Sequence, residues 1–211
     1  MVTVRRCLVT GVSLVIGYAI LLRRPLLTWG ATPAEAAMQL PGDDVLPRSD
    51  LTATRAITIE AGAAQVWPWL VQLGQGRGGF YSYDALENLV GCDIHSADRI
   101  VPAWQHLAVG DEVHLHPEVA LSVAAVEPDH ALVLRGAVSA TGGQQSAPYD
   151  FTWAFVLRDG GAGTTRLLVR ERYSYLQPAA AALVEPVAVV SFVMTQRMLR
   201  GIRDRAERAS R

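Results

Sequence analysis

Residues 150–175, DFTWAFVLRDGGAGTTRLLVRERYSY, decide the fold because they contain two long stretches of alternating side chains. Aromatic and aliphatic residues occupy every second position within 150–158, and a similar alternation returns within 164–175. Successive side chains of a β-strand point to opposite faces of the sheet, so both stretches are predicted to be strands. The glycine-rich residues 159–163 between them predict a tight turn, which favours an antiparallel pair.

The inner faces of these strands hold the first candidate site residues. We expect the apolar rows to point inward, namely Phe151, Trp153, Phe155 and Leu157 in the first strand and Leu167, Val169, Glu171, Tyr173 and Tyr175 in the second. The aromatic row is interpreted either as ordinary core or, for Trp153 above all, as a wall in contact with a ligand.

Glu171 is predicted to be an inward carboxylate, and such a group needs a partner or takes up a proton. Arg135 or Tyr173 could serve as that partner. Two interpretations stay open. Glu171 joins a structural ion pair or reaches solvent at a bulge, or it acts as a general base in catalysis together with Tyr173 or a histidine.

Further strands and two short helices are predicted on the N-terminal side of this pair. Residues 63–73 and 83–90 have the composition of short helices, and a glycine follows each of them. Short turns separate most of the strands, which favours an antiparallel meander. The additional strands are expected at residues 54–60, 112–116, 120–126 and 131–135.

A long helix is predicted to end the chain at residues 186–208, with Pro186 in its first turn. Its first half is apolar nearly all round and its last turns are charged, so the first half is expected to be buried and the end solvated. A membrane span through residues 179–194 is the lesser interpretation, because Glu185 and Pro186 interrupt it.

This order of elements predicts an α+β fold in which an antiparallel sheet wraps around a long C-terminal helix. The most specific stretches are WGAT at 29–32, ATRAITI at 53–59, WPWLVQ at 67–72, GFYSYD at 79–84 and LVRERY at 168–173. On these stretches the chain resembles membrane-tethered bacterial members of the START-like superfamily, also called SRPBCC or polyketide cyclase/dehydrase and lipid-transport proteins. The resemblance implies a helix-grip fold with an apolar cavity between sheet and helix. Activities diverge within one fold, so it implies a cavity and not a particular reaction.

The N-terminal segment 7–22, CLVTGVSLVIGYAILL, carries no charge and lies between two pairs of arginines. A spanning helix needs roughly 20 apolar residues, which neighbouring apolar residues can complete. We therefore predict a single-pass membrane anchor, with a cleaved signal peptide or a buried helix as alternatives. The expected division is an anchor at 1–29, a linker at 30–50 and the domain at 51–211.

Charge and composition exclude several functions. The formal net charge is −1 and the arginines are spread along the chain, so no nucleic-acid partner is expected. All 19 basic residues are arginine, which excludes lysine Schiff-base chemistry. Cys7 and Cys92 lie far apart in the sequence, and no disulfide is expected between them.

No cofactor or metal is predicted. Acidic and histidine side chains gather in the middle of the chain without a ligand motif such as HExxH, and a tetrahedral site needs three or four convergent ligands. They are Asp93, His95, His106, His114 and His116.

The leading hypothesis is a membrane-anchored domain that binds a hydrophobic small molecule or lipid in its cavity. A second group of aromatic residues precedes the second strand, where the mouth of the cavity is expected, and would cover an apolar ligand. These residues are Trp67, Trp69, Tyr81, Tyr83 and Trp104. The alternatives are a cyclase/dehydrase-type enzyme that uses Glu171 in the same cavity, and a structural or interaction protein whose cavity is filled by its own side chains.

Overall fold

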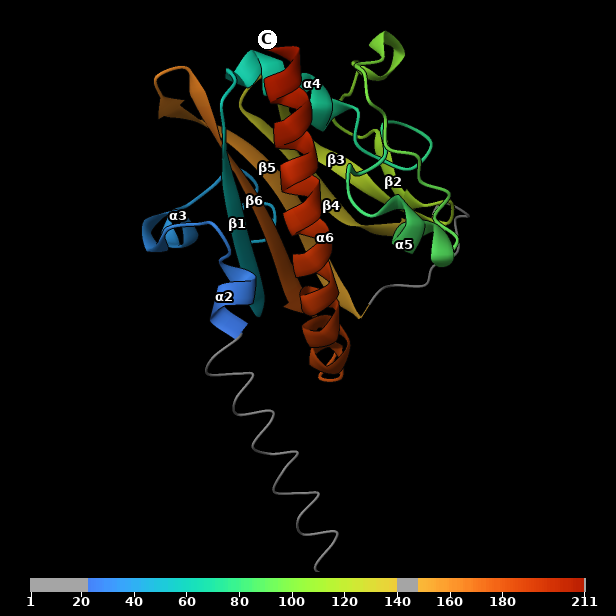
Figure 1. Ribbon diagram of the computed structural model, residues 1–211. Coiled ribbons are helices and arrows are strands. Elements are labelled where there is room, and N and C mark those ends of the chain that lie inside the picture. Colours follow the sequence, from blue (N-terminus) through green and yellow to red (C-terminus); the bar gives the residue numbers. More distant parts are fainter. Residues whose placement is uncertain (1–22, 140–147, 211) are drawn as a thin grey trace, which may run out of the picture.

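The computed structural model describes residues 23–139 and 148–210, so the predicted anchor segment 7–22 lies outside the described residues. Six strands form one antiparallel sheet in the order β1-β6-β5-β4-β3-β2. A long C-terminal helix, α6, runs across one face of this sheet (Figure 1). The predicted α+β architecture, an antiparallel sheet with a long terminal helix, is confirmed. The strands are β1 Leu51–Ile59, β2 Glu112–His116, β3 Val119–Glu127, β4 Ala131–Ser139, β5 Tyr149–Gly161 and β6 Thr164–Tyr175.

The strand pair predicted at 150–175 is the centre of the sheet. In the β5–β6 ladder Trp153 lies opposite Glu171 and Phe155 lies opposite Val169. Paired residues of an antiparallel ladder share a face, so the two predicted inner rows lie side by side beneath α6. Phe155 and Val169 belong to the main hydrophobic core.

The connection from β1 to β2 carries the predicted short helices. Helix α4 spans Ala63–Val71, α5 spans Asp84–Leu89, and a 3₁₀ turn, η2, spans Pro102–Trp104. α4 packs against α6, β5 and β6, where Trp69 and Leu70 enter the main core.

Helix α6 spans Ala180–Ala209, so it begins six residues before the predicted start. Pro186 lies in its second turn and not in its first. The residues from Ala180 to Val184 are three alanines, a leucine and a valine, most of which are strong helix formers, and the proline removes only one backbone donor from the helix.

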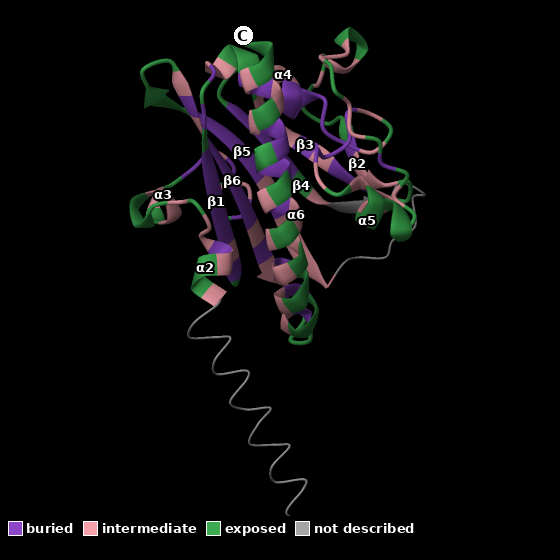
Figure 2. Ribbon diagram, viewed as in Figure 1, coloured by how far each residue is buried: buried purple, intermediate pink, exposed green. Residues whose placement is uncertain are grey.

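The predicted burial of α6 was wrong. Its apolar first half exposes Leu183, Val187, Val190 and Val193, while its charged second half buries Met198, Leu199, Ile202 and Ala206. The second half is covered because α4 and the main core meet it there, whereas the first half contacts α2, Arg23–Leu27, and the β1 end of the sheet. Figure 2 shows exposed residues along the outward side of the first half of α6.

Residues 30–50, predicted as a linker, lie on the outer face of the sheet and include the short helix α3, Pro33–Ala37. We call them the outer strap. Three arginines of β6, on the side of the sheet away from α6, hold it there. Arg166 pairs with Glu35, Arg170 with Asp43, and Arg172 donates to the carbonyls of Leu46 and Pro47. Leu40 of the strap packs on Ala56 and Leu168.

The residues just before the strap also belong to the folded unit. Leu27 is buried, Trp29 packs against the main core, and the Ala56 amide donates to the Trp29 carbonyl at 3.0 Å. Gly30 has a φ of +71°, and a side chain there would collide with the carbonyl oxygen of Ala56. Described structure that is continuous with the domain therefore starts at residue 23 and not at 51.

Candidate functional site

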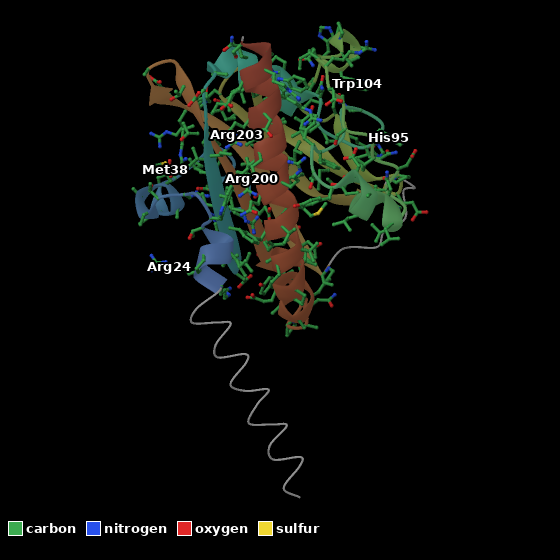
Figure 3. All side chains as sticks on the ribbon, in the orientation of Figure 1. Arg24, Met38, His95, Trp104, Arg200 and Arg203 are labelled. Atoms are coloured by element: carbon green, nitrogen blue, oxygen red, sulfur yellow. The ribbon has the colours of Figure 1, made fainter. Side chains whose placement is uncertain are left out.

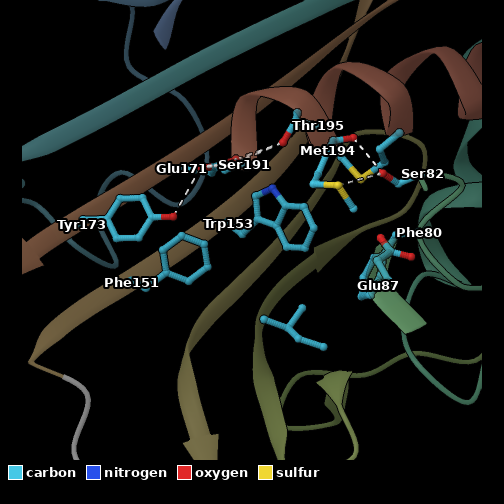
Figure 4. A pocket seen from close by; sticks show the side chains of 12 residues that line it. Phe80, Ser82, Glu87, Phe151, Trp153, Glu171, Tyr173, Ser191, Met194 and Thr195 are labelled. Carbon is cyan, nitrogen blue, oxygen red and sulfur yellow. Dashed lines mark hydrogen bonds between the residues drawn. The ribbon is translucent and has the colours of Figure 1, made fainter. Parts of the chain in front are cut away.

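A pocket of about 220 Å³ lies between the inner face of β5–β6 and helix α6 (Figure 4). Four of the predicted site residues line it: Phe151, Trp153, Glu171 and Tyr173. Its other lining residues come from the loop before α5, from α5, from β2 and from α6, and are Phe80, Ser82, Glu87, Leu115, Ser191, Met194, Thr195 and Met198.

Tight packing positions the loop that closes one side of the pocket. Ser82 Oγ donates to the Met194 carbonyl at 3.1 Å. The Tyr81 carbonyl approaches Gly201 so closely that a side chain at 201 would collide with it. At the start of α5, Asp84 accepts hydrogen bonds from the amide and the hydroxyl of Ser96. α5 thereby places Glu87 at the pocket.

Glu171 forms a buried ion pair with Arg55 of β1. Arg55 Nη1 and Glu171 Oε1 are 2.8 Å apart, and the two side chains are 1% and 3% exposed. The same guanidinium donates to the Leu26 carbonyl of α2 and to the Ala188 carbonyl of α6. The interpretation of Glu171 as half of an ion pair therefore describes its geometry, although it also faces the pocket.

Three hydroxyl groups complete the surroundings of this carboxylate. Ser191 Oγ lies 2.6 Å from Oε1 and 2.8 Å from Oε2, Thr195 Oγ1 donates to Oε1 at 3.2 Å, and the Tyr173 hydroxyl donates to Oε2 at 3.4 Å. Burial, and then the neighbouring Glu171 charge, raises the pKa of Tyr173 far above its usual range. A substrate proton reaching Glu171 would have to displace one of these donors.

Two polar atoms of the pocket lack hydrogen-bond partners among the described residues. The buried side-chain atoms without a partner are Trp153 Nε1, Glu87 Oε2 and Arg77 Nε, and the first two belong to pocket-lining residues. Burial, and then the nearby Asp84 charge, raises the pKa of Glu87 to about 7. An unpaired buried donor or acceptor costs roughly 1–3 kcal/mol, so both atoms are places where a ligand would gain binding energy.

Other predicted site residues lie outside the pocket. Phe155 and Val169 are core, and Trp67 packs partly buried against that core. Tyr81 is buried and donates its hydroxyl proton to the Trp69 carbonyl at 3.1 Å, which makes both residues part of the packing around α4. Tyr83 is exposed, and Trp104 lies half-buried in the loops on the β2 side (Figure 3).

Arg135 is not the partner of Glu171. It lies opposite Thr152 in the β4–β5 ladder and so on the face away from Trp153, where it is exposed. The partner is Arg55, which the sequence interpretation missed. A signal for it exists, because Arg55 alternates with Ala53 and Ile57 on the apolar side of β1.

The α6 contribution to the pocket was also missed. Ser191, Met194, Thr195 and Met198 follow the spacing of one helical face and include two hydroxyls. Because the whole first half of this helix was expected to be buried, the sequence did not single out one of its faces as a pocket wall.

The histidines lie apart from this pocket. His95 contacts Asp93 at 3.2 Å and His114 contacts Glu112 at 3.5 Å, all four on the surface or partly exposed. Within residues 23–139 and 148–210, no group of three histidine, cysteine or acidic side chains is placed to hold a metal ion.

No protein-family model matches the chain, and no curated protein matches it. Solved structures with a similar chain path include a hypothetical protein from Helicobacter pylori, which is 15% identical with a TM-score of 0.49 over 83% of this chain and 99% of that one. A norcoclaurine synthase point mutant from Thalictrum flavum, in complex with a transition-state analogue, is 14% identical with a TM-score of 0.47 over 76% and 96%. Protein MLL2253 from Mesorhizobium loti is 17% identical with a TM-score of 0.45 over 75% and 98%. We draw no functional inference from likenesses of this degree.

Replacing one member of the buried pair should destabilise the fold strongly. Glu171→Gln leaves the Arg55 charge buried without a counter-charge, so the free energy of unfolding should fall by about 3–5 kcal/mol. Urea unfolding of the purified chain measures this loss.

The matched control for that variant is Glu185→Gln, which breaks the partly exposed ion pair with Arg23 and should cost about 1 kcal/mol or less. Adding Arg55→Met to Glu171→Gln should restore part of the lost stability, because no unpaired charge then stays buried. Equal unfolding midpoints for the two single variants would contradict this account of the pair.

Proposed function

We propose that this protein is a membrane-attached START-like protein that binds a small hydrophobic molecule in the pocket between α6 and β5–β6. The observation that carries the proposal is the open space itself, walled by Phe151, Trp153, Met194 and Met198. A protein whose cavity is filled by its own side chains would leave no such space beside two unpaired polar atoms. The superfamily assignment rests on the order of elements and on the resembling stretches.

The size of the pocket limits the ligand. Pockets for drug-sized ligands usually measure roughly 300–1,000 Å³, and this one measures about 220 Å³. A small ring system or the end of an acyl chain fits such a space. A whole lipid would have to leave most of its length outside.

The unpaired atoms suggest the polar part of the ligand. Trp153 Nε1 can only donate a hydrogen bond, and Glu87 can donate one while it is protonated. Both groups are satisfied by an acceptor oxygen, such as a carbonyl or an ether. We therefore favour an uncharged ligand with an apolar body and at least one acceptor oxygen.

Catalysis is the second candidate because Glu171 and Tyr173 both line the pocket. We rank it below binding because the oxygens of Glu171 already accept hydrogen bonds from Arg55 and from hydroxyl groups. A general base needs a lone pair directed at the substrate proton.

Membrane attachment is proposed through segment 7–22. Among the described residues, α6 also has the length and apolar composition of a membrane span. Its buried residues are distributed along the helix and pack against the sheet, α2 and α4. We therefore assign α6 to the domain and the anchor to the N-terminal segment.

Filling the pocket should abolish ligand binding. Met194→Trp places an indole in the space beside Trp153, so native mass spectrometry and solvent extraction of the purified chain should show the apolar ligand lost. Arg208→Trp, at an exposed position in the last turn of α6, adds the same side chain away from the pocket and should keep the ligand. Retention of the ligand by a folded Met194→Trp variant would count against this pocket as the binding site.

Ligand affinity should depend on pH through Glu87. The carboxyl is protonated in the folded chain below its raised pKa of about 7, so its donor is present at lower pH and lost as pH rises through that value. Titration of an aryl ketone into the protein should show affinity falling above neutral pH. Glu87→Gln keeps a donor that does not titrate, and its affinity should stay flat. A wild-type profile without this fall would exclude the assigned role.

Removal of residues 1–22 should release the protein from membranes during an alkaline wash, because the proposed anchor is then absent. The cut follows residue 22 because Leu26, Leu27 and Trp29 contact the domain. Membrane fractions of the full and shortened chains, compared by immunoblot, measure the difference. Resistance of the shortened chain to the wash would instead favour α6 as a span.

A further inference from the structure

The first half of α6 presents a continuous apolar row to the outside. Its members follow helical spacing and are strongly exposed: Leu183 at 48%, Val187 at 37%, Val190 at 63% and Val193 at 43%. Leu176, just before the helix, is 57% exposed. Single exposed apolar residues are ordinary, but a contiguous row of them marks a surface that contacts a partner or lipid. We call the four helix residues the exposed row.

The charges around the exposed row have the pattern of a membrane interface. Between residues 176 and 196 the only charged residue is Glu185, and Arg23 of α2 neutralises it at 2.8 Å. Further along the same helix face the exposed residues become Arg197 and Arg200. Arginines that border an apolar helix face suit the level of lipid phosphates.

The position of α2 identifies the occupant of this surface. Arg23 directly follows the proposed anchor and pairs with Glu185, whose position along α6 lies between those of Leu183 and Val187. α2 lies beside the first half of α6 in Figure 1, and Figure 3 places Arg24 on α2 and Arg200 further along α6. A chain leaving the bilayer at residue 22 therefore brings lipid headgroups to the level of the exposed row.

A neighbouring stripe of the same helix segment lines the pocket. Ser191 and Met194 line the pocket, whereas Val190 and Val193, each one residue away, belong to the exposed row. The pocket wall and the exposed row are therefore adjacent stripes of α6.

We propose that the exposed row rests in the interfacial layer of the bilayer, with Arg23, Arg24, Arg197 and Arg200 among the headgroups. This inference rests on the proposed membrane attachment and extends it from the anchor to the folded domain. The domain then lies on the lipid surface in one orientation, with the pocket beside the bilayer. An apolar ligand passes between the two over a short path.

The test uses the full chain with Cys7 and Cys92 replaced by serine and one new cysteine carrying an environment-sensitive fluorophore. The label is placed at Val187 or Val190 in the exposed row, or at Asp204, an exposed polar position further along α6. Vesicles of phosphatidylcholine and phosphatidylglycerol carry a quencher on the acyl chains. We expect a blue shift and several-fold stronger quenching at Val187 and Val190 than at Asp204.

Quenching at the exposed row that is no stronger than at Asp204 overturns the inference. A blue shift without lipid quenching, together with cross-linked dimers of the Val190→Cys chain, also overturns it, because a second copy then covers the row. Near-ultraviolet circular dichroism confirms that each labelled chain is folded. The ligand content of the same samples reports on the pocket, and their alkaline extraction reports on the anchor. If the protein does not insert during reconstitution, it is added to preformed vesicles and the same quenching is measured.

Discussion

The ion pair between Arg55 and Glu171 holds β1, β6, α6 and α2 together beside the pocket. Through one guanidinium, β1 is joined to β6, to the backbone of α6 at Ala188 and to the backbone of α2 at Leu26. Removing two charges from water is costly, and the surrounding hydroxyl groups offset part of that cost. The pair joins these elements in one specific arrangement. Here it fixes the position of α6 above β6, and that position determines the width of the pocket.

The sequence predicted the strands of the sheet better than the contacts within the pocket, because the two depend on different information. Alternation along 150–175 reports which side of a strand is buried. Phe151, Trp153, Glu171 and Tyr173 could therefore be assigned to the inner face, and these four pocket-lining residues were identified in advance. Partners across strands depend on register, which alternation alone does not supply. Arg135 and Tyr173 were therefore named as partners and Arg55 was missed, although Arg55 lies on the apolar row of its own strand.

Helix α6 illustrates the other limit of sequence reasoning. A segment that is apolar on every side is expected to be buried, yet composition cannot say what covers each side. The sheet and α2 cover only a narrow stripe at Val184 and Ala188, and the outward side is left bare. The outer strap shows the reverse case. Arg170 lies on the outer side of β6, yet it is buried because the strap supplies it with Asp43 and three backbone carbonyls.

The pairing of the first described strand with the last has a consequence for synthesis on the ribosome. Arg55 and Glu171 are 116 residues apart, and chains grow at roughly 5–20 residues per second, so β6 follows β1 by on the order of ten seconds. During that interval β1 has no neighbour in the sheet, and the arginines that hold the outer strap have not yet been made. The nascent chain therefore carries an unpaired strand and an unpaired charge until β6 has been synthesised. A chaperone that shields this edge would act in that interval.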